Sequence, residues 1–276
     1  MTKQFHVPTP HQDNPEAMPS FQQPRMGVSN SMMQEQMLAS NPHQNMKNGN
    51  DANKIKEIQS TYQIAEGLAM SSDVQLFMKS NVYKAMVRLV KKEGWDPEYA
   101  ASWLGQAVVE TGNPTLHDLD VVERGSGKGR GMFQYTGERR GPYDSARQQA
   151  ITRGQNPNDI NWQIDYALDK DNSYVNMDRF REGLTDPKKN YRFNPKWGTA
   201  TGKTPTGKSY GNKFSNANQL MGAYGKDKVA GYTRALTGEF TRPGTHHMDR
   251  RLKASKHILR MYKKVQNQQN NTKKLA

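Results

Sequence analysis

The chain has 276 residues, of which 33% are hydrophobic, and it carries a formal net charge of +14 with a mean hydropathy of −1.00. No window approaches the roughly 18 uncharged apolar residues of a membrane span, which argues against a transmembrane protein. The chain contains no cysteine, which excludes disulfides, thiolate catalysis and cysteine-based zinc sites.

The first fifty residues predict a disordered arm. Residues 1–50 hold six of the 14 prolines and seven of the 15 methionines, without sustained helical or strand periodicity. An alternative is that the Met-rich part, 26–40, forms a short docking helix against a partner. Residues 51–72 predict a helical linker. No apolar segment typical of a secretory signal opens the chain, so we expect another carrier to bring it to a cell wall.

A globular, mainly helical domain is expected over residues 73–265. Asp73 is placed to cap a helix that Gly94 stops, and a second helix is framed by Asp96, Pro97 and Gly112. Further helices are predicted at 141–153, 159–170, 174–183, 216–222, 227–237 and 248–265.

Two other segments shape the expected domain. The sequence DLDVVERGSGKGRGMFQYTG predicts a small β-hairpin around a turn at 125–129, so the expected fold class is mainly α with one hairpin. The stretch 187–226 contains no acidic residue, eight Lys or Arg, and a Gly/Thr-rich part that predicts a long basic insertion. Residues 266–276 are expected to be a polar tail.

The charge is concentrated in the expected domain. Residues 1–60 carry five basic and five acidic residues, so the whole excess lies on 61–276. A basic domain of this kind favours a polyanionic partner, either nucleic acid or the acidic polymers and peptide carboxylates of a bacterial wall.

One carboxyl is placed unusually. Glu110 ends the helix WLGQAVVE and shares a face with the apolar Trp103 and Ala107. Loss of hydration on that face and the negative end of the helix dipole both favour its protonated form. A carboxyl kept protonated is what a glycosidase general acid requires. The alternative is an ordinary helix-end glutamate whose side chain turns to water.

The sequence after this helix resembles two families of cell-wall and chitin hydrolases. The string Gly129 to Gly137, GRGMFQYTG, is similar to the GRG-x-x-Q-x-T-G string of family 19 chitinases. A closer resemblance is to the phage tail lysozyme family, in which a helix ending in Glu is followed by Asn-Pro and then by such a hairpin. Four further segments are similar to that family: Gly94-Trp95, residues 160–168, residues 240–244 and residues 251–259.

The resemblance implies a lysozyme-like fold and a set of site residues. Glu110 would be the general acid that cleaves the β-1,4 bond between N-acetylmuramic acid and N-acetylglucosamine. Substrate-binding roles fall to residues of the hairpin and of the turn after it: Gln134, Tyr135, Gly129, Gly131 and Arg139. Tyr143 and Trp162 are further candidates for stacking on sugars, although burial in the core is the commoner outcome for aromatic side chains.

The second carboxylate has three candidates in the first limb of the hairpin. Glu123 is favoured over Asp118 and Asp120 because it lies next to the turn. A carboxyl separation of about 5 Å would imply retention, and roughly 6.5–9.5 Å would imply inversion. A lytic transglycosylase that uses Glu110 alone is a further alternative.

These features predict a peptidoglycan glycosidase that a phage virion carries to open the wall during genome entry, with residues 1–72 contacting other tail or internal virion proteins. No metal or other cofactor is expected, since adjacent His246 and His247 are more often solvated than metal-bound. Endolysin activity is one alternative. A basic virion protein that binds DNA during ejection, without enzyme activity, is another.

Overall fold

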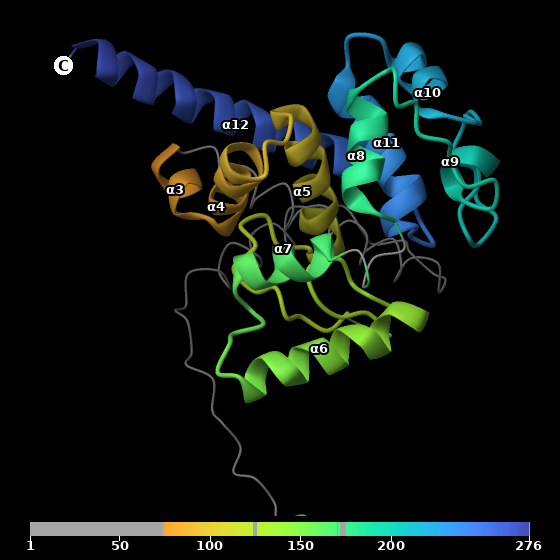
Figure 1. Cartoon of the computed structure of the whole chain (residues 1–276), viewed down its shortest axis with the longest axis horizontal. Helices are drawn as coiled ribbons and strands as arrows, with labels where there is room; N and C mark the ends of the chain where they lie inside the picture. Colours follow the sequence, from red (N-terminus) through yellow and green to blue (C-terminus); the bar gives the residue numbers. More distant parts are fainter. Residues whose placement is uncertain (1–73, 124–125, 170, 172–174, 276) are drawn as a thin grey trace, which may run out of the picture. The chain divides into compact units, whose positions relative to one another are not determined.

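The computed structural model describes residues 74–123, 126–169, 171 and 175–275 (Figure 1). They all belong to one compact unit, residues 52–276. The expected arm at 1–50 and the expected linker at 51–72 lie outside the described residues. Within the described part of the chain, no helix combines the length and hydrophobicity that a membrane span needs.

The described residues are mostly helical, as the sequence predicts. The α-helices are α3 (Val74–Lys79), α4 (Asn81–Val87), α5 (Pro97–Thr111), α6 (Arg140–Thr152), α7 (Ile160–Leu168), α8 (Met177–Thr185), α9 (Gly198–Thr201), α10 (Ala217–Tyr224), α11 (Lys228–Leu236) and α12 (Met248–Leu275). Two π-helical segments, η1 (Arg88–Lys92) and η3 (Thr237–Thr241), extend α4 and α11, and a 3₁₀ turn, η2 (Gly137–Arg139), precedes α6.

The predicted ends of α5 are confirmed. The Asp96 carboxylate accepts hydrogen bonds from the backbone N–H groups of Glu98 and Tyr99, at 2.8 and 3.2 Å. Pro97 occupies the first turn, and Gly112 closes the helix with a left-handed φ of 63°. These caps fix where the helix ends and so place Glu110 in its last turn.

The helix predicted between Asp73 and Gly94 is instead divided at Ser80. The Ser80 hydroxyl donates to the carbonyl of Phe77 at 2.6 Å and accepts from the N–H of Tyr83 at 3.2 Å. A serine that caps a new helix in this way offers the backbone an alternative to continuing the old one. The chain therefore turns between α3 and α4.

The predicted β-hairpin does not form strands in the described residues. Only single antiparallel bridges join Val122 to Arg130 and Arg130 to Tyr135. The reason is a tight turn at Gly131 and Gln134, whose φ angles are +80° and +47°. Arg130 and Tyr135 exchange both backbone hydrogen bonds around this turn. The second limb of the predicted hairpin therefore pairs with itself and does not continue a ladder with the first limb.

The expected basic insertion at 187–226 folds back on itself and contains α9. Its ends meet through a bridge between Arg192 and Asn216, and its middle is closed by a bridge between Lys203 and Ser209. The N–H of Phe193 donates to the carbonyl of Ser215 at 3.0 Å. Backbone hydrogen bonds therefore close this segment into a folded loop.

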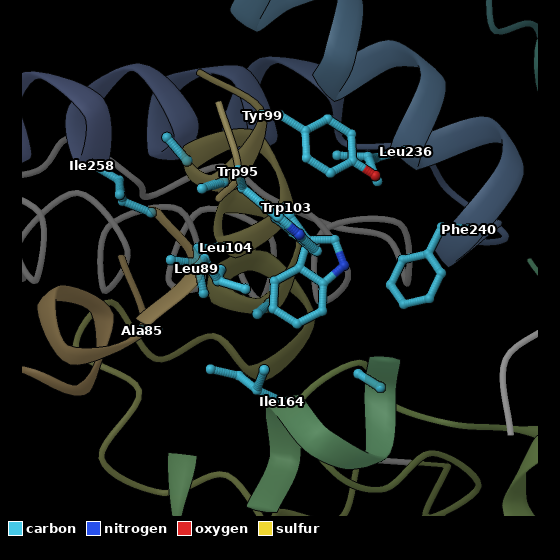
Figure 2. Packing of buried hydrophobic residues seen from close by; sticks show 14 of the residues in the cluster. Ala85, Leu89, Trp95, Tyr99, Trp103, Leu104, Ile164, Leu236, Phe240 and Ile258 are labelled. Atoms are coloured by element: carbon cyan, nitrogen blue, oxygen red, sulfur yellow. The ribbon is translucent and has the colours of Figure 1, made fainter. Parts of the chain in front are cut away.

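The core is built around α5, which packs against α11 and α12. Trp103 of α5 is fully buried, and its ring lies 5.6 Å from that of Trp95, 4.6 Å from that of Phe133 and 6.4 Å from that of Phe240. The first two pairs are edge-to-face and the third is stacked, and both arrangements add to the stabilisation from burial. Figure 2 shows Trp95, Trp103 and Phe240 among the buried residues. The aromatic cluster ties the middle of α5 to the turn at 131–134 and to η3.

Helices α5 and α12 approach each other closely at Gly105. A Cβ atom at this position would lie 2.1 Å from the Ser255 hydroxyl and 2.9 Å from the Ser255 backbone nitrogen. The backbone of α12 cannot move away without disturbing its contacts along α5. Glycine is therefore required at this crossing.

We expect Gly105→Ala to lower the free energy of unfolding by about 1–3 kcal/mol through overpacking. The gain in helix propensity, about 1 kcal/mol, does not offset a backbone clash. Urea unfolding of the purified variant measures this. Gly141→Ala in α6, where no atom lies within 4 Å of the added carbon, is the matched control and should be neutral or stabilising. Equal behaviour of the two variants would contradict the close approach.

Candidate active site

Glu110 forms an ion pair with an arginine that the sequence does not single out. The Nη2 of Arg251, from α12, donates to Oε1 of Glu110 at 2.7 Å, and the two side chains are 2% and 15% exposed. Arg251 binds Oε1 and leaves the other carboxyl oxygen, Oε2, outside this contact. The guanidinium gives the carboxyl a fixed partner, whereas the sequence predicts only apolar surroundings and the negative end of the helix dipole.

The same arginine binds a second residue of α5. Its Nη1 donates at 2.7 Å to Oε1 of Gln106, one helical turn before Glu110, and its Nε donates at 2.8 Å to the carbonyl of His246. The Gln106 oxygen also accepts from the hydroxyls of Thr237 and Thr241, at 3.2 and 3.3 Å. Arg251 thus has fixed partners for all its nitrogens, and this holds the Glu110 carboxyl in place.

A pocket of about 500 Å³ opens in front of this ion pair, and we call it the acid pocket. Glu110 and Arg251 line one side, and Glu123 lines it from the first limb of the turn region. The structure therefore brings together the predicted acid and the favoured second carboxylate. Thr206 and Lys208, from the basic segment, complete the wall.

Glu123 is exposed, and local contacts orient its carboxylate. Its Oε2 accepts a hydrogen bond from the Ser126 hydroxyl and another from the N–H of Gly129, at 3.1 Å. The other two candidates lie elsewhere. Asp120 is held by Arg130 and Arg147, at 3.1 and 2.5 Å.

Asp118 is exposed and lines none of the described pockets, so its carboxyl does not face the acid pocket. Asp120 also accepts a hydrogen bond from the Tyr143 hydroxyl at 3.3 Å. Its position among two arginines and a tyrosine is that of a structural ion pair. Of the three candidates, only Glu123 faces the acid pocket.

Gln134 does not line the acid pocket and is buried in the turn that it helps to form. Its amide nitrogen donates to the carbonyls of Gly131 and Val121, at 3.0 and 3.4 Å. A Cβ added at Gly129 would lie 2.9 Å from the Gln134 Oε1, and one at Gly131 would lie 2.5 Å from the Tyr143 ring. In the structure these three residues therefore serve close packing of the turn.

Tyr135 and Arg139 are also buried and make contacts within the fold. Tyr135 is 2% exposed, with its ring 5.0 Å from that of Tyr143, so its face is covered by other aromatic rings. Arg139 donates to the carbonyl of Phe240 at 3.1 Å and also lines a second, larger pocket. Trp162 is half-buried and stacks on Tyr166 at 5.7 Å.

The residues that sequence reasoning missed reach the site through long-range contacts. Arg251 is 141 residues from Glu110 in the chain, although it is the first residue of the 251–259 segment that resembles the phage tail lysozyme family. Gln106 lies four residues before Glu110, on the same helix face, and that spacing was the available signal. Nothing in the sequence pattern indicates that Thr206 and Lys208 reach this pocket.

Burial changes the titration of several groups beside the site. Burial raises the pKa of Glu239 in η3, while the N–H of Asn194, which donates to it at 3.1 Å, works in the opposite direction. Burial lowers the pKa of Arg234 and raises that of Tyr210 to about 12. None of the three residues lines the acid pocket, so these pKa shifts belong to the surrounding structure and not to the pocket itself.

The described residues include no cluster of three or more His, Asp or Glu arranged to hold a metal ion. His246 accepts a hydrogen bond from the N–H of Met248 at 3.2 Å, and its ring packs 5.3 Å from that of Tyr210. His247 lines the acid pocket beside Arg251. The side chains that line the acid pocket include carboxyl, guanidinium, ammonium and imidazole groups.

Comparison with curated proteins and with solved structures gives no match for this chain. A family model gives one: the phage tail lysozyme model matches residues 80–262. The matched range runs from Ser80, which caps α4, to Tyr262 in α12, and it includes both α5 and the basic segment. On this match, which covers more than half of its length, the chain belongs to the phage tail lysozyme family.

Proposed function

We propose that the protein is a muramidase that a phage virion carries and that cuts peptidoglycan locally during genome entry. Its substrate is the β-1,4 bond between N-acetylmuramic acid and N-acetylglucosamine. Family membership supports a lysozyme-like peptidoglycan hydrolase associated with a phage tail. The observation that carries the proposal is the acid pocket, in which two carboxyl groups from different segments line one cavity beside a buried arginine.

In the proposed reaction, Glu110 is the general acid and gives its proton to the glycosidic oxygen from Oε2, the oxygen that Arg251 leaves unbound. Proton transfer leaves a carboxylate, and the guanidinium of Arg251 stabilises that charge through Oε1. Arg251 is thus a positioning residue that favours the product side of the transfer. Glu123, across the pocket, acts as the second carboxylate and stabilises the sugar cation or activates water.

The proposal includes the route to the wall. A virion-borne enzyme is delivered by the particle, and residues 1–72 are proposed to contact other virion proteins. The excess of basic residues on 61–276 suits a substrate that carries carboxylates. An endolysin, a lytic transglycosylase and a DNA-binding ejection protein are the competing functions.

Assays of wall clearing and of duplex DNA binding distinguish the proposed muramidase from the competing DNA-binding protein. The full-length protein should clear a suspension of purified walls and release soluble muropeptides. A protein that leaves walls from several hosts intact, but binds duplex DNA with an affinity that falls steeply with salt, would show that the DNA-binding function is correct.

Replacement of Glu123 tests the second carboxylate. We expect Glu123→Gln to slow wall clearing by about 10²-fold or more, the lower range for loss of a positioned acid or base. Its unfolding free energy should change little because the side chain is exposed. Asp118→Asn is the matched control, which should clear walls like the wild type. Full activity of Glu123→Gln would leave Glu110 acting alone, as in a transglycosylase.

A further inference from the structure

A second pocket lies beside the acid pocket, and one thin bridge of chain separates them. This second pocket has a volume of about 740 Å³, and we call it the lysine pocket. Its wall includes Pro205 and Gly207, whereas Thr206 and Lys208 line the acid pocket. Neighbouring residues of one segment therefore face opposite cavities.

A second segment forms the other half of the bridge in the same way. Arg242 lines the lysine pocket, and the following Pro243 and Gly244 line the acid pocket. The Thr206 hydroxyl donates to the carbonyl of Gly244 at 2.7 Å, and Lys208 Nζ lies 3.3 Å from the Thr245 hydroxyl oxygen. These bonds join the two segments, so a ligand in the acid pocket has the lysine pocket directly beyond the bridge.

The lysine pocket is positively charged. Its wall contains four cationic residues, Arg139, Lys196, Lys203 and Arg242, against one acid, Glu138. The two arginines lie over aromatic rings, Arg242 at 4.5 Å from the centre of the Trp197 ring and Arg139 at 5.7 Å from that of Phe240. These contacts hold each guanidinium group against an aromatic ring, and one of the two rings, that of Trp197, lines the pocket.

The two lysines are arranged differently. Lys196 and Lys203 are exposed, and within the described ranges neither ammonium group pairs with a carboxylate. Both belong to the acid-free stretch 187–226, so no acid of that segment neutralises them. Two long cationic side chains at the rim of a pocket with aromatic and arginine walls suit a ligand that carries carboxylates on a flexible chain.

Peptidoglycan supplies such a ligand next to each muramic acid. A short stem peptide leaves the lactyl group of this sugar and carries free carboxylates, so a glycan bound at Glu110 directs a peptide away from the acid pocket. We propose that the lysine pocket binds the carboxylates of this stem peptide, with Lys196 and Lys203 as their partners. The proposal rests on the proposed glycosidase function and adds a peptide-dependent specificity to it.

The test measures binding without cleavage. Full-length Glu110→Gln protein is co-sedimented with intact walls and with the same walls after an amidase has removed the stem peptides. Adding Lys196→Gln and Lys203→Gln should weaken binding to intact walls about three- to tenfold, the size expected for two exposed ion pairs. Binding to stripped glycan should stay the same. The difference should shrink as salt is raised.

A matched control removes the same charge elsewhere. Lys226 and Lys228 are exposed and are absent from the described pockets, so their replacement by Gln should weaken binding to both substrates equally and slightly. Equal weakening by Lys196→Gln/Lys203→Gln on intact and stripped walls would overturn the proposal, and so would unchanged binding to both. Loss of duplex DNA binding with unchanged wall binding would identify nucleic acid as the occupant and also overturn it.

Failure of the pocket and failure of the proposed function give different results. If the wild type does not clear walls but the Glu110→Gln protein still binds intact walls better than stripped ones through the two lysines, the lysine pocket is supported and the glycosidase is not. If the wild type clears both substrates and the lysine variant binds like its parent, the glycosidase stands and the peptide site does not.

Discussion

Glu110→Gln is expected to lower the rate of wall clearing by about 10²- to 10⁴-fold, the contribution that a positioned general acid makes. Glutamine keeps the shape of the side chain and an oxygen that accepts the hydrogen bond from Arg251 at the place of Oε1. It has no proton of suitable acidity to give to a glycosidic oxygen. The initial rate of turbidity loss, at matched protein concentrations, measures the effect.

The control for this substitution lies on the same helix. Glu98 in the first turn of α5 forms an ion pair with Lys263 of α12 at 2.7 Å, so both glutamates join α5 to the same partner helix. Glu98→Gln should clear walls at the wild-type rate because Glu98 is absent from the described pockets. An equal loss of activity in the two variants would mean that activity depends on the contact between the helices and not on proton transfer from Glu110.

Arg251→Leu is expected to destabilise the fold by about 3–5 kcal/mol, since it removes one partner of a largely buried ion pair and leaves a carboxylate without its cation. The Gln106 oxygen loses its donor at 2.7 Å in the same change. Urea unfolding measures the free energy. The substitution should also abolish wall clearing at temperatures where the variant remains folded, because the Glu110 carboxyl is no longer held.

A double-mutant cycle separates these two effects of Arg251. In the Glu110→Gln background no charge is left behind, so Arg251→Leu should cost less than in the wild type. Arg251→Lys keeps a cation near Oε1 and should restore part of both stability and activity. Equal destabilisation by Arg251→Leu in both backgrounds would contradict a role that depends on the Glu110 charge.

The parts of the fold that local chemistry determines were predictable. Asp96, Pro97 and Gly112 specify the ends of α5 through their own side chains and backbone angles, and the structure confirms them. The position of Glu110 in the last turn follows from those caps. Ser80 shows the limit, since its hydroxyl stops one helix and starts the next where the hydrophobic pattern runs on without a break.

The sequence predicts the position of the turn region correctly, but not its secondary structure. The Gly-rich sequence indicates a chain reversal, and one occurs, but the left-handed Gln134 and the contact of Gly131 with Tyr143 make it too tight for strands. Those constraints come from packing against α6 and are not written in the spacing of residues. The sequence also gives no sign that Gln134 uses its amide to hold this turn.

The site itself depends on contacts between distant segments. The sequence indicates a glutamate at an apolar helix end, but its counter-ion Arg251 belongs to a helix that starts more than a hundred residues later. The same holds for the basic segment, whose composition predicts charge but not that its residues line the acid pocket. Pairings of this kind follow from how helices pack, which a single sequence pattern does not contain.

Mass spectrometry of the soluble products from purified walls tests the central claim most directly, because it identifies which bond of the wall is broken. Digestion with the wild type should release muropeptides that end in reducing N-acetylmuramic acid, and Glu110→Gln should release almost none. Products whose stem peptides are cut while their glycan strands remain whole, or equal yields of sugar ends from both proteins, would contradict the assignment of Glu110 as the acid of a glycosidase.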